Sequence, residues 1–485
     1  MRTRLRGRYA IGFDGGHCII PGGEVVYEDD RIVFVGRGYA GPVDRTIDAS
    51  DCLISPGFVN LHGVVNVDLQ LFRIDVDDFG FPKTRWWIER EEDEVLNEAH
   101  TEASVRFSVA SLLKGGATTF GAITTMAPKR WEDPRYEPEL IAEVAGQMGA
   151  RAYVAHQVRA IVPYSDGVER GQVVGEGRAL RALDRAVAFA KRIDGSFGGR
   201  IRGYLFPYTL DASTPALLRA AKAAADEMGT HMRTHFAQSM TEVHEIMERY
   251  GKTPVDYLES LGLLARNLLL THTLYIAGNG PYEDPEDRDL KRLAARGVSV
   301  CHCPAVYVRR GITLRSFSRY RRAGINLGLG TDTFPQDMIA EMKWAAVTCK
   351  IEEHSVLAGT AAEVFNAATL GGAHALGRDD LGRLAPGAKA DIVTIDLDQL
   401  HIGPVADPIN VLIHHATARD IRQVIIDGRT VVDNSRLVGV DEEALIAAAQ
   451  VPYDALRAQF SRWDRGHRPA GALFPPSLPS IGRRT

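Results

Sequence analysis

The sequence has few cysteines, and none of them form the CxxC pairs typical of metal knuckles and redox sites. Its five cysteines are odd in number, which favours free or buried thiols over a set of disulfides. Cys301 and Cys303 flank His302, but residues two apart on a strand share a face that the residue between them does not join. We therefore do not expect a Cys/His metal site at this position.

Long apolar runs and an excess of positive charge are also missing. No stretch approaches the ~18 apolar residues that a membrane-spanning helix needs, and the N-terminal segment has no long apolar core of a secretory signal. The formal net charge of -5 provides no broad cationic field for phosphate backbones. We expect a cytoplasmic protein with neither a membrane nor a nucleic acid as its partner.

The sequence does have the composition and length of a globular protein with a large core and a smaller second unit. It contains 485 residues, of which 45% are hydrophobic and 25% charged. Both chain ends consist of short β-type runs with glycine-rich turns, such as Gly387 and the pair Asp427 and Gly428. We expect residues 1–55 and 380–440 to form a small β-sandwich, followed by a C-terminal helix and tail over 441–485.

Between these ends, short apolar runs alternate with amphipathic stretches that often end in glycine, the pattern of βα units around a parallel sheet. The candidate strands are CLISPGFVNLH, ATTFGAITT, RAYVAHQV, IRGYLFPYTL, THMRTHFAQ, LLLTHTLYI, VSVCHCPA and INLGLGTD. Eight such repeats predict a (β/α)8 TIM barrel over residues 56–379. Barrels of this kind carry their chemistry at the C-terminal ends of the strands.

Metal-competent side chains end the first, fifth, sixth and eighth of these strands: His62, His235, His272 and Asp332. A single histidine at a strand end is more often a hydrogen-bonded core residue than a ligand. Four such groups on one rim instead predict a divalent cation with an open position for a water, whose pKa the cation lowers toward neutrality. The sequence therefore predicts a hydrolytic metal site at the barrel mouth.

These motifs resemble the amidohydrolase superfamily, in the branch with chlorotriazine hydrolases, guanine-type and adenosylhomocysteine-type deaminases, and phenylurea and molinate hydrolases. The resemblance covers nearly the whole chain. Its most specific segments are PGFVNLHG, SVCHCPA, GLGTD, ATLGGAHALG and GRLAPGAKADIVTID. It implies that His62 and His235 are metal ligands and that Asp332 is a ligand that also accepts a proton from the attacking water. It implies that His272 is either a ligand or the residue that orients that water.

The resemblance also implies one metal ion in place of two. The fourth candidate strand has no lysine, so the carboxylated lysine that bridges two metals in other members of the superfamily has no counterpart there. Nitrogen and oxygen ligands make zinc the first choice, and cobalt, iron or manganese stay open.

The first-strand motif departs from the His-x-His of most relatives, because Val64 stands where the second histidine is expected. Valine cannot bind a metal. Asn60 lies two residues before His62 on the same strand face, and its amide oxygen is a candidate replacement ligand. The alternative is that Asn60 only hydrogen-bonds the backbone at the strand end. An Asn-x-His motif makes the phenylurea and molinate hydrolases the closest functional models.

Other departures concern the substrate. Gln238 stands where deaminating relatives often have the glutamate of His-x-x-Glu, and an amide cannot donate a proton as a general acid. Tyr307 and Phe334 replace small polar groups, which favours an aromatic or hydrophobic substrate, although both could be ordinary packing residues. His156 and Arg233 are candidates to polarise or orient a substrate carbonyl.

From these residues we predict a mononuclear metal-dependent hydrolase that cleaves a C–N or C–S bond of a urea, carbamate, thiocarbamate or amide-like small hydrophobic molecule. In that reaction Asp332, His272 and His235 are the catalytic residues. Two alternatives stay open: an aminohydrolase or dechlorinase acting on a purine, pyrimidine or triazine ring, and a catalytically silent scaffold. We further expect a homo-oligomer, and a lid formed by the long connection from Leu69 to Leu96.

Overall fold

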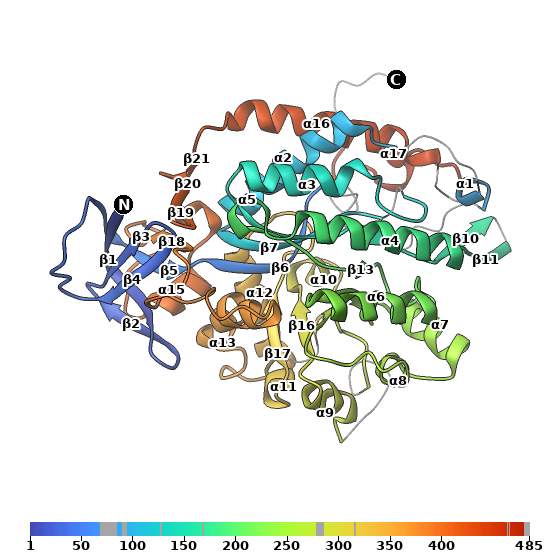
Figure 1. Ribbon diagram of the computed structural model, residues 1–485, viewed down its shortest axis with the longest axis horizontal. Helices are drawn as coiled ribbons and strands as arrows, with labels where there is room; N and C mark the ends of the chain where they lie inside the picture. The colour runs from blue at the N-terminus through green and yellow to red at the C-terminus, as the bar shows by residue number, and fades with distance from the viewer. Residues whose placement is uncertain are drawn as a thin grey trace.

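The computed structural model describes residues 1–67, 85–89, 95–126, 129–166, 169–277, 286–314, 317–462, 464 and 466–479. Two large sheets organise it: a parallel barrel ringed by helices, and a second sheet at one side that holds the N-terminus (Figure 1). Most of the lid expected between Leu69 and Leu96 lies outside the described residues.

The barrel consists of eight parallel strands in the order β12-β8-β7-β6-β17-β16-β15-β14. Their bounds are β6 (Phe58–Val64), β7 (Ala117–Ile123), β8 (Arg151–Val154), β12 (Ile201–Gly203), β14 (Met232–Phe236), β15 (Leu268–His272), β16 (Ser299–His302) and β17 (Asn326–Leu329). Single parallel bridges from Leu205 to Met232 and from Thr209 to His235 close the ring beside β14. The predicted TIM barrel is confirmed, and each candidate strand contributes to it.

Helices cover the outside of the barrel, as the amphipathic stretches predict (Figure 1). The longer ones are α2 (Glu98–Lys114), α3 (Tyr136–Gln147), α4 (Glu176–Ile193), α6 (Pro215–Met228), α7 (Met240–Tyr250) and α12 (Met338–Glu352). Shorter ones are α1 (Arg85–Glu89), α8 (Pro254–Ser260), α9 (Arg288–Ala295), α10 (Pro304–Val308), α11 (Phe317–Arg322), α13 (Ala361–Asn366), α14 (Gly372–Ala375) and α15 (Pro408–His414). A β-hairpin of β10 (Ile161–Asp166) and β11 (Glu169–Val174) precedes α4.

Both chain ends contribute strands to one nine-stranded sheet, in the order β21-β20-β19-β18-β5-β1-β3-β4 with β2 paired to β1. Its strands are β1 (Arg2–Phe13), β2 (His17–Pro21), β3 (Glu24–Glu28), β4 (Arg31–Gly36), β5 (Arg45–Pro56), β18 (Ile392–Asp396), β19 (Ile421–Ile426), β20 (Arg429–Asp433) and β21 (Arg436–Leu437). Apolar residues from both ends, including Leu5, Val25, Leu384 and Ile425, share its buried core. The expected β unit built from both chain ends is therefore present.

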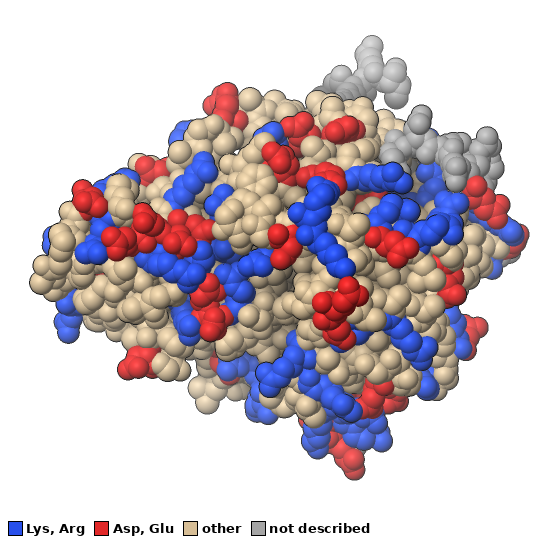
Figure 2. Space-filling model, viewed as in Figure 1, with Lys and Arg blue, Asp and Glu red and all other residues tan. Residues whose placement is uncertain are grey.

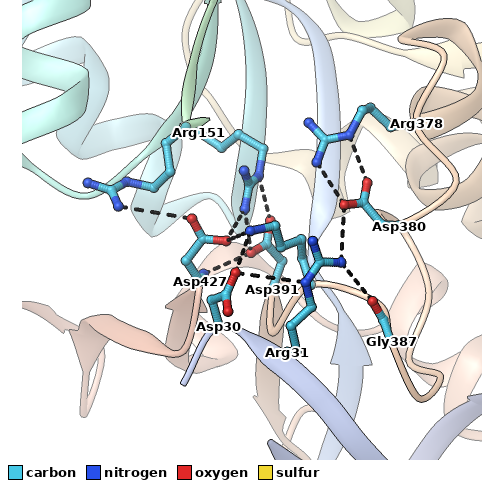
Figure 3. Close-up of polar contacts among 10 residues, drawn as sticks. Asp30, Arg31, Arg151, Arg378, Asp380, Gly387, Asp391 and Asp427 are labelled. Carbon is cyan, nitrogen blue, oxygen red and sulfur yellow. Dashed lines mark hydrogen bonds and ion pairs between the residues drawn. The ribbon is translucent and has the colours of Figure 1, made fainter. Parts of the chain in front are cut away.

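A buried ion network joins this terminal sheet to the base of the barrel (Figure 3). Arg151, the first residue of β8, donates from Nε and Nη2 to the carboxylate of Asp391 at 3.0 and 3.1 Å. The same Nη2 lies 2.5 Å from Asp427 Oδ1. Lys389 Nζ bridges Asp427 at 3.2 Å and Asp30 at 2.6 Å. Charge pairing thus holds the barrel base against the sheet.

The C-terminal segment packs on its own barrel. Helix α16 (Glu442–Ala458) lies along α2 (Figure 1). Beyond it, Phe460 and Phe474 join a buried cluster that contains Trp87, Trp131 and Val67. Since Val67 follows β6 directly, this segment contributes to the mouth side of the barrel, where the strands end.

The distribution of surface charge and the character of the helices agree with the near-neutral charge and the short apolar runs of the sequence. Positive and negative side chains are interspersed over the face shown in Figure 2. Among the described residues, no helix combines the length and the apolar character needed to cross a membrane.

Candidate metal centre

Three histidines meet at the C-terminal ends of three barrel strands. His62 lies on β6, His235 on β14 and His272 at the end of β15, and one ring nitrogen of each lies within 4.8 Å of the other two. The centroid of the His62 ring lies 4.9 Å from that of the His235 ring and 5.3 Å from that of the His272 ring. All three side chains are buried. The sequence prediction that these strand ends converge is confirmed by this geometry.

Asp332 completes the cluster from the end of β17. Its Oδ1 lies 3.6 Å from His62 Nε2 and its Oδ2 lies 3.8 Å from His272 Nε2. These distances place the carboxylate beside two of the imidazoles without a direct hydrogen bond to either of them. The aspartate side chain is 19% exposed, so it reaches the solvent side of the cluster.

The cluster fits a divalent cation. Neither ring nitrogen of His62 has a hydrogen-bond partner, and His272 Nδ1 also lacks one. Buried nitrogens without partners are costly, and a bound cation would satisfy the lone pairs that face the cluster. Three imidazoles and a carboxylate are ligands that zinc accepts, and catalytic zinc sites commonly use three protein ligands and hold a water at the fourth position.

The protonation states suit metal binding as well. Burial is the main cause that lowers the pKa of His235 to about 3, and it lowers the pKa of His272 well below the usual histidine value. Both imidazoles are therefore neutral at pH 7. The Nδ1–H of His235 donates to the carbonyl oxygen of Tyr208 at 2.6 Å. This bond orients the ring and leaves the Nε2 lone pair free for a ligand role.

The backbone of two cluster residues adopts an uncommon conformation at the strand ends. His272 has φ 75° and Asp332 has φ 59°, both in the left-handed region that residues other than glycine rarely adopt. The Asp332 N–H donates to the His62 carbonyl at 2.6 Å, and the Val64 N–H donates to the Asp332 carbonyl at 2.8 Å. Residues held in such conformations cluster at functional sites.

Asn60 hydrogen-bonds the backbone and the Thr331 hydroxyl beside the cluster. Its Oδ1 accepts the backbone N–H groups of His62 at 3.1 Å and Thr331 at 3.2 Å, and its Nδ2 donates to the Thr331 hydroxyl at 2.8 Å. These bonds agree with the alternative interpretation, in which Asn60 hydrogen-bonds the backbone at the strand end. A ligand role for this amide oxygen stays a prediction.

Two of the residues predicted to bind substrate lie next to the cluster. Tyr307, on α10, is buried with its ring centroid 5.0 Å from that of His272, edge to face. Arg233 lies inside the barrel with its guanidinium carbon 4.9 Å from the centre of the Phe206 ring, which packs on His235. Arg233 Nη1 donates to the Tyr204 hydroxyl at 3.2 Å, whereas its Nη2 has no hydrogen-bond partner.

His156 and Phe334 face other neighbours. His156 Nε2 lies 3.0 Å from Glu132 Oε2, and Glu132 also pairs with Arg185. The Phe334 ring stacks on Phe107 of α2 at 5.4 Å. It lines a separate cavity of about 730 Å³ between α2 and the terminal sheet. A role for either residue in substrate binding stays a prediction.

Helix α7, which follows β14, holds one functional residue that the sequence analysis missed. Glu242, buried on α7, accepts the backbone N–H of Ala237 at 3.1 Å and that of Gln238 at 2.9 Å. It therefore fixes the turn that carries Gln238, which is itself only partly buried. The spacing from the N-cap Ser239 to Glu242 follows the Ser-x-x-Glu helix-start pattern, and that pattern was the available signal.

A second missed residue lies after β17. Gln336 is buried, and its Nε2 donates to the carbonyl of Val64 at 2.8 Å. No sequence motif marks it, because its partner is a backbone group from the other end of the barrel sequence.

The family model named Amidohydrolase family matches residues 53–431, which is most of the chain. The chain belongs to the amidohydrolase family. The match agrees with the fold and with the histidine and aspartate cluster at its mouth. It makes the protein a metal-dependent hydrolase, as the sequence analysis predicts.

Known relatives cover nearly the whole chain. A 5-methylthioadenosine/S-adenosylhomocysteine deaminase from Desulforudis audaxviator is 29% identical over 93% of this chain and 98% of its own length. One from Thermococcus onnurineus is 30% identical over 84% of this chain and 89% of its own.

Solved structures agree with the fold. An adenosine deaminase from Xanthomonas campestris with bound zinc has a TM-score of 0.77 and 24% identity over 94% of this chain and 98% of its own. An atrazine chlorohydrolase from Arthrobacter aurescens TC1 complexed with zinc has a TM-score of 0.74 and 23% identity over 93% and 99%. Zinc is thus the ion in both structures, in agreement with the donor set of this chain.

Proposed function

We propose that this amidohydrolase is an aminohydrolase that removes the amino group from a nitrogen heterocycle, with an adenine-containing nucleoside as the first substrate class to test. The observation that carries its hydrolytic part is the cluster of three buried histidines with Asp332 beside it. Support for the heterocycle comes from deaminases that align with 93% of the chain. This proposal adopts the alternative from the sequence analysis over its main prediction.

His62, His235 and His272 would hold the cation, with Asp332 as a fourth ligand or as the proton acceptor beside it. A bound divalent ion supplies Lewis acidity, which lowers the pKa of a coordinated water toward neutrality. The Asp332 carboxylate accepts one proton from the attacking water as the oxygen adds to the amino-bearing ring carbon. The C–N bond to the amino group then breaks, and the proton from Asp332 leaves with ammonia.

Gln238 sets a limit on this reaction. Its amide can donate a hydrogen bond to a ring nitrogen but cannot transfer a proton to it. In this route the ring nitrogen is hydrogen-bonded but not protonated, because the one proton that Asp332 accepts leaves with ammonia. We expect slower deamination than an acid at position 238 would support.

That same glutamine favours a second candidate, the hydrolysis of an amide-like bond in a urea, carbamate or thiocarbamate. Such substrates need no proton on a ring nitrogen, because the leaving amine or thiol can take the proton that Asp332 has accepted. The buried Tyr307 ring beside His272 gives the site an apolar wall that suits a hydrophobic acyl group. The third possibility, a catalytically silent scaffold, lacks such support, because His62, His235 and His272 lie close together with Asp332 beside them.

The zinc-loaded protein should be tested against adenosine, 5-methylthioadenosine and S-adenosylhomocysteine, and in parallel against phenylureas, carbamates and thiocarbamates. Ammonia release from the purines is the expected result. Replacing Gln238 with glutamate should raise that rate by about tenfold or more, because a general acid contributes roughly 10²–10⁴-fold where it is well placed. Release of an amine or thiol from the second panel, without ammonia from the first, would establish the other candidate.

A further inference from the structure

The seam between the first and last barrel strands has little backbone pairing. Strand β17 pairs with β6 through Leu329 and Asn60 alone, and one further bridge joins Gly63 to Asp332. On its other side, β17 pairs with β16 at four successive positions. The register between β6 and β7 also shifts after Asn60. This thinly paired seam nevertheless carries His62 and Asp332.

A chain of side-chain hydrogen bonds spans the same seam. Asn60 accepts the N–H groups of His62 and Thr331 at Oδ1 and donates to the Thr331 hydroxyl from Nδ2. That hydroxyl donates to Gln336 Oε1, and Gln336 Nε2 donates to the Val64 carbonyl. The chain thus starts on β6, crosses to the end of β17 and returns to β6.

The network is buried and its amides are satisfied. Asn60 and Thr331 have no exposed surface and Gln336 is 3% exposed. Buried amides contribute little net stability compared with apolar groups of the same shape, but their directional bonds fix geometry. Each bond ends on His62, on Thr331 next to Asp332, or on Val64 at the end of β6.

We infer that Asn60, Thr331 and Gln336 are positioning residues that hold His62 and Asp332 at the separation the cation requires. Two backbone bonds join Asp332 to His62 and Val64 at the strand ends, and the side-chain network adds to them along the rest of the seam. Phe334 anchors the same loop from its other side by stacking on Phe107. The inference concerns the metal centre and not the substrate.

Cobalt binding to the full-length metal-free protein tests this inference. Thr331→Val removes the hydroxyl and keeps the shape of the side chain, and Gln336→Leu removes both amide bonds. Each should raise the dissociation constant for Co²⁺ by about 10–100-fold and change the visible Co²⁺ spectrum, because loss of the groups that orient ligands typically has this effect. Thr331→Ser retains the hydroxyl and should bind Co²⁺ much as the wild type does.

Gln423→Leu provides a matched control in the terminal sheet. Gln423 is 8% exposed, and its Nε2 donates to Asp433 at 2.8 Å. This variant should lower the melting temperature and leave Co²⁺ binding unchanged. Wild-type affinity and spectrum in both Thr331→Val and Gln336→Leu would overturn the inference, and so would equal weakening by Gln423→Leu. No substrate is used, so failure of the proposed reaction leaves this test intact.

Discussion

The role of Asp332 can be tested directly by substitution. Its carboxylate lies beside two imidazoles and is partly exposed to solvent. Asp332→Asn keeps the size of the side chain but cannot accept a proton. We expect kcat to fall by about 10²–10⁴-fold, the usual contribution of a general base. The melting temperature should change little. Near-full turnover in this variant would remove Asp332 from the reaction.

A second residue, His302, should make the stability of the folded protein depend on pH. It is buried at the end of β16, outside the histidine cluster, and burial lowers its pKa from the usual histidine value of about 6.5 to about 3. Between these values the unfolded chain binds a proton that the folded protein does not, so stability falls as the pH falls from about 6.5 toward 3.

Urea unfolding at pH 7 and pH 5 measures this effect. The wild type should lose about 2 kcal/mol more than His302→Gln does between the two pH values, from roughly 1.4 kcal/mol per pH unit. Equal losses in the two proteins would show that His302 is not held neutral in the folded state.

The sequence predicts which residues stand on the barrel rim better than it predicts what they touch. Strand periodicity and the position of each histidine at a strand end place His62, His235 and His272 correctly. The orientation of Asn60, Phe334 and His156 depends on partners that are far away in the sequence. The most distant of these partners is Thr331, which lies 271 residues from Asn60.

At the scale of elements, α16 shows how the C-terminal segment is held. Leu456 on this helix is fully buried in the cluster beside the barrel mouth, whereas Ile446 on the same helix is 62% exposed. Leu456→Ala should lower the free energy of unfolding by about 2–5 kcal/mol. Ile446→Ala should change it by no more than about 0.5 kcal/mol. Denaturant unfolding measures both, and similar values for the two would show that α16 is not anchored through Leu456.

Elements with strong periodicity could be predicted, and irregular ones could not. The eight strands and the long helices follow from their alternating and helical patterns. The fourth candidate strand, IRGYLFPYTL, is predicted too long. The structure has two short strands within it, Ile201–Gly203 and Phe206–Pro207. The packing of Phe460 and Phe474 in one cluster with Trp87 and Trp131 has no local signal, because it depends on tertiary contacts alone.

For the whole molecule, the ion network in Figure 3 couples the terminal sheet to the barrel. Arg151 is 1% exposed and carries the charge opposite Asp391 and Asp427. Arg151→Leu leaves those carboxylates without their main partner and should cost about 3–5 kcal/mol of unfolding free energy. Calorimetry would show a lower melting temperature, and an unchanged transition would contradict this role.

The central claim is that the ends of β6, β14, β15 and β17 together bind one divalent cation. Elemental analysis by mass spectrometry, after zinc loading and exhaustive dialysis, tests this most directly on the wild type and on His62→Ala and His235→Ala. We predict one equivalent of zinc per subunit in the wild type and a large loss in both variants. Zinc-free wild-type protein, or full retention in the variants, would contradict the account.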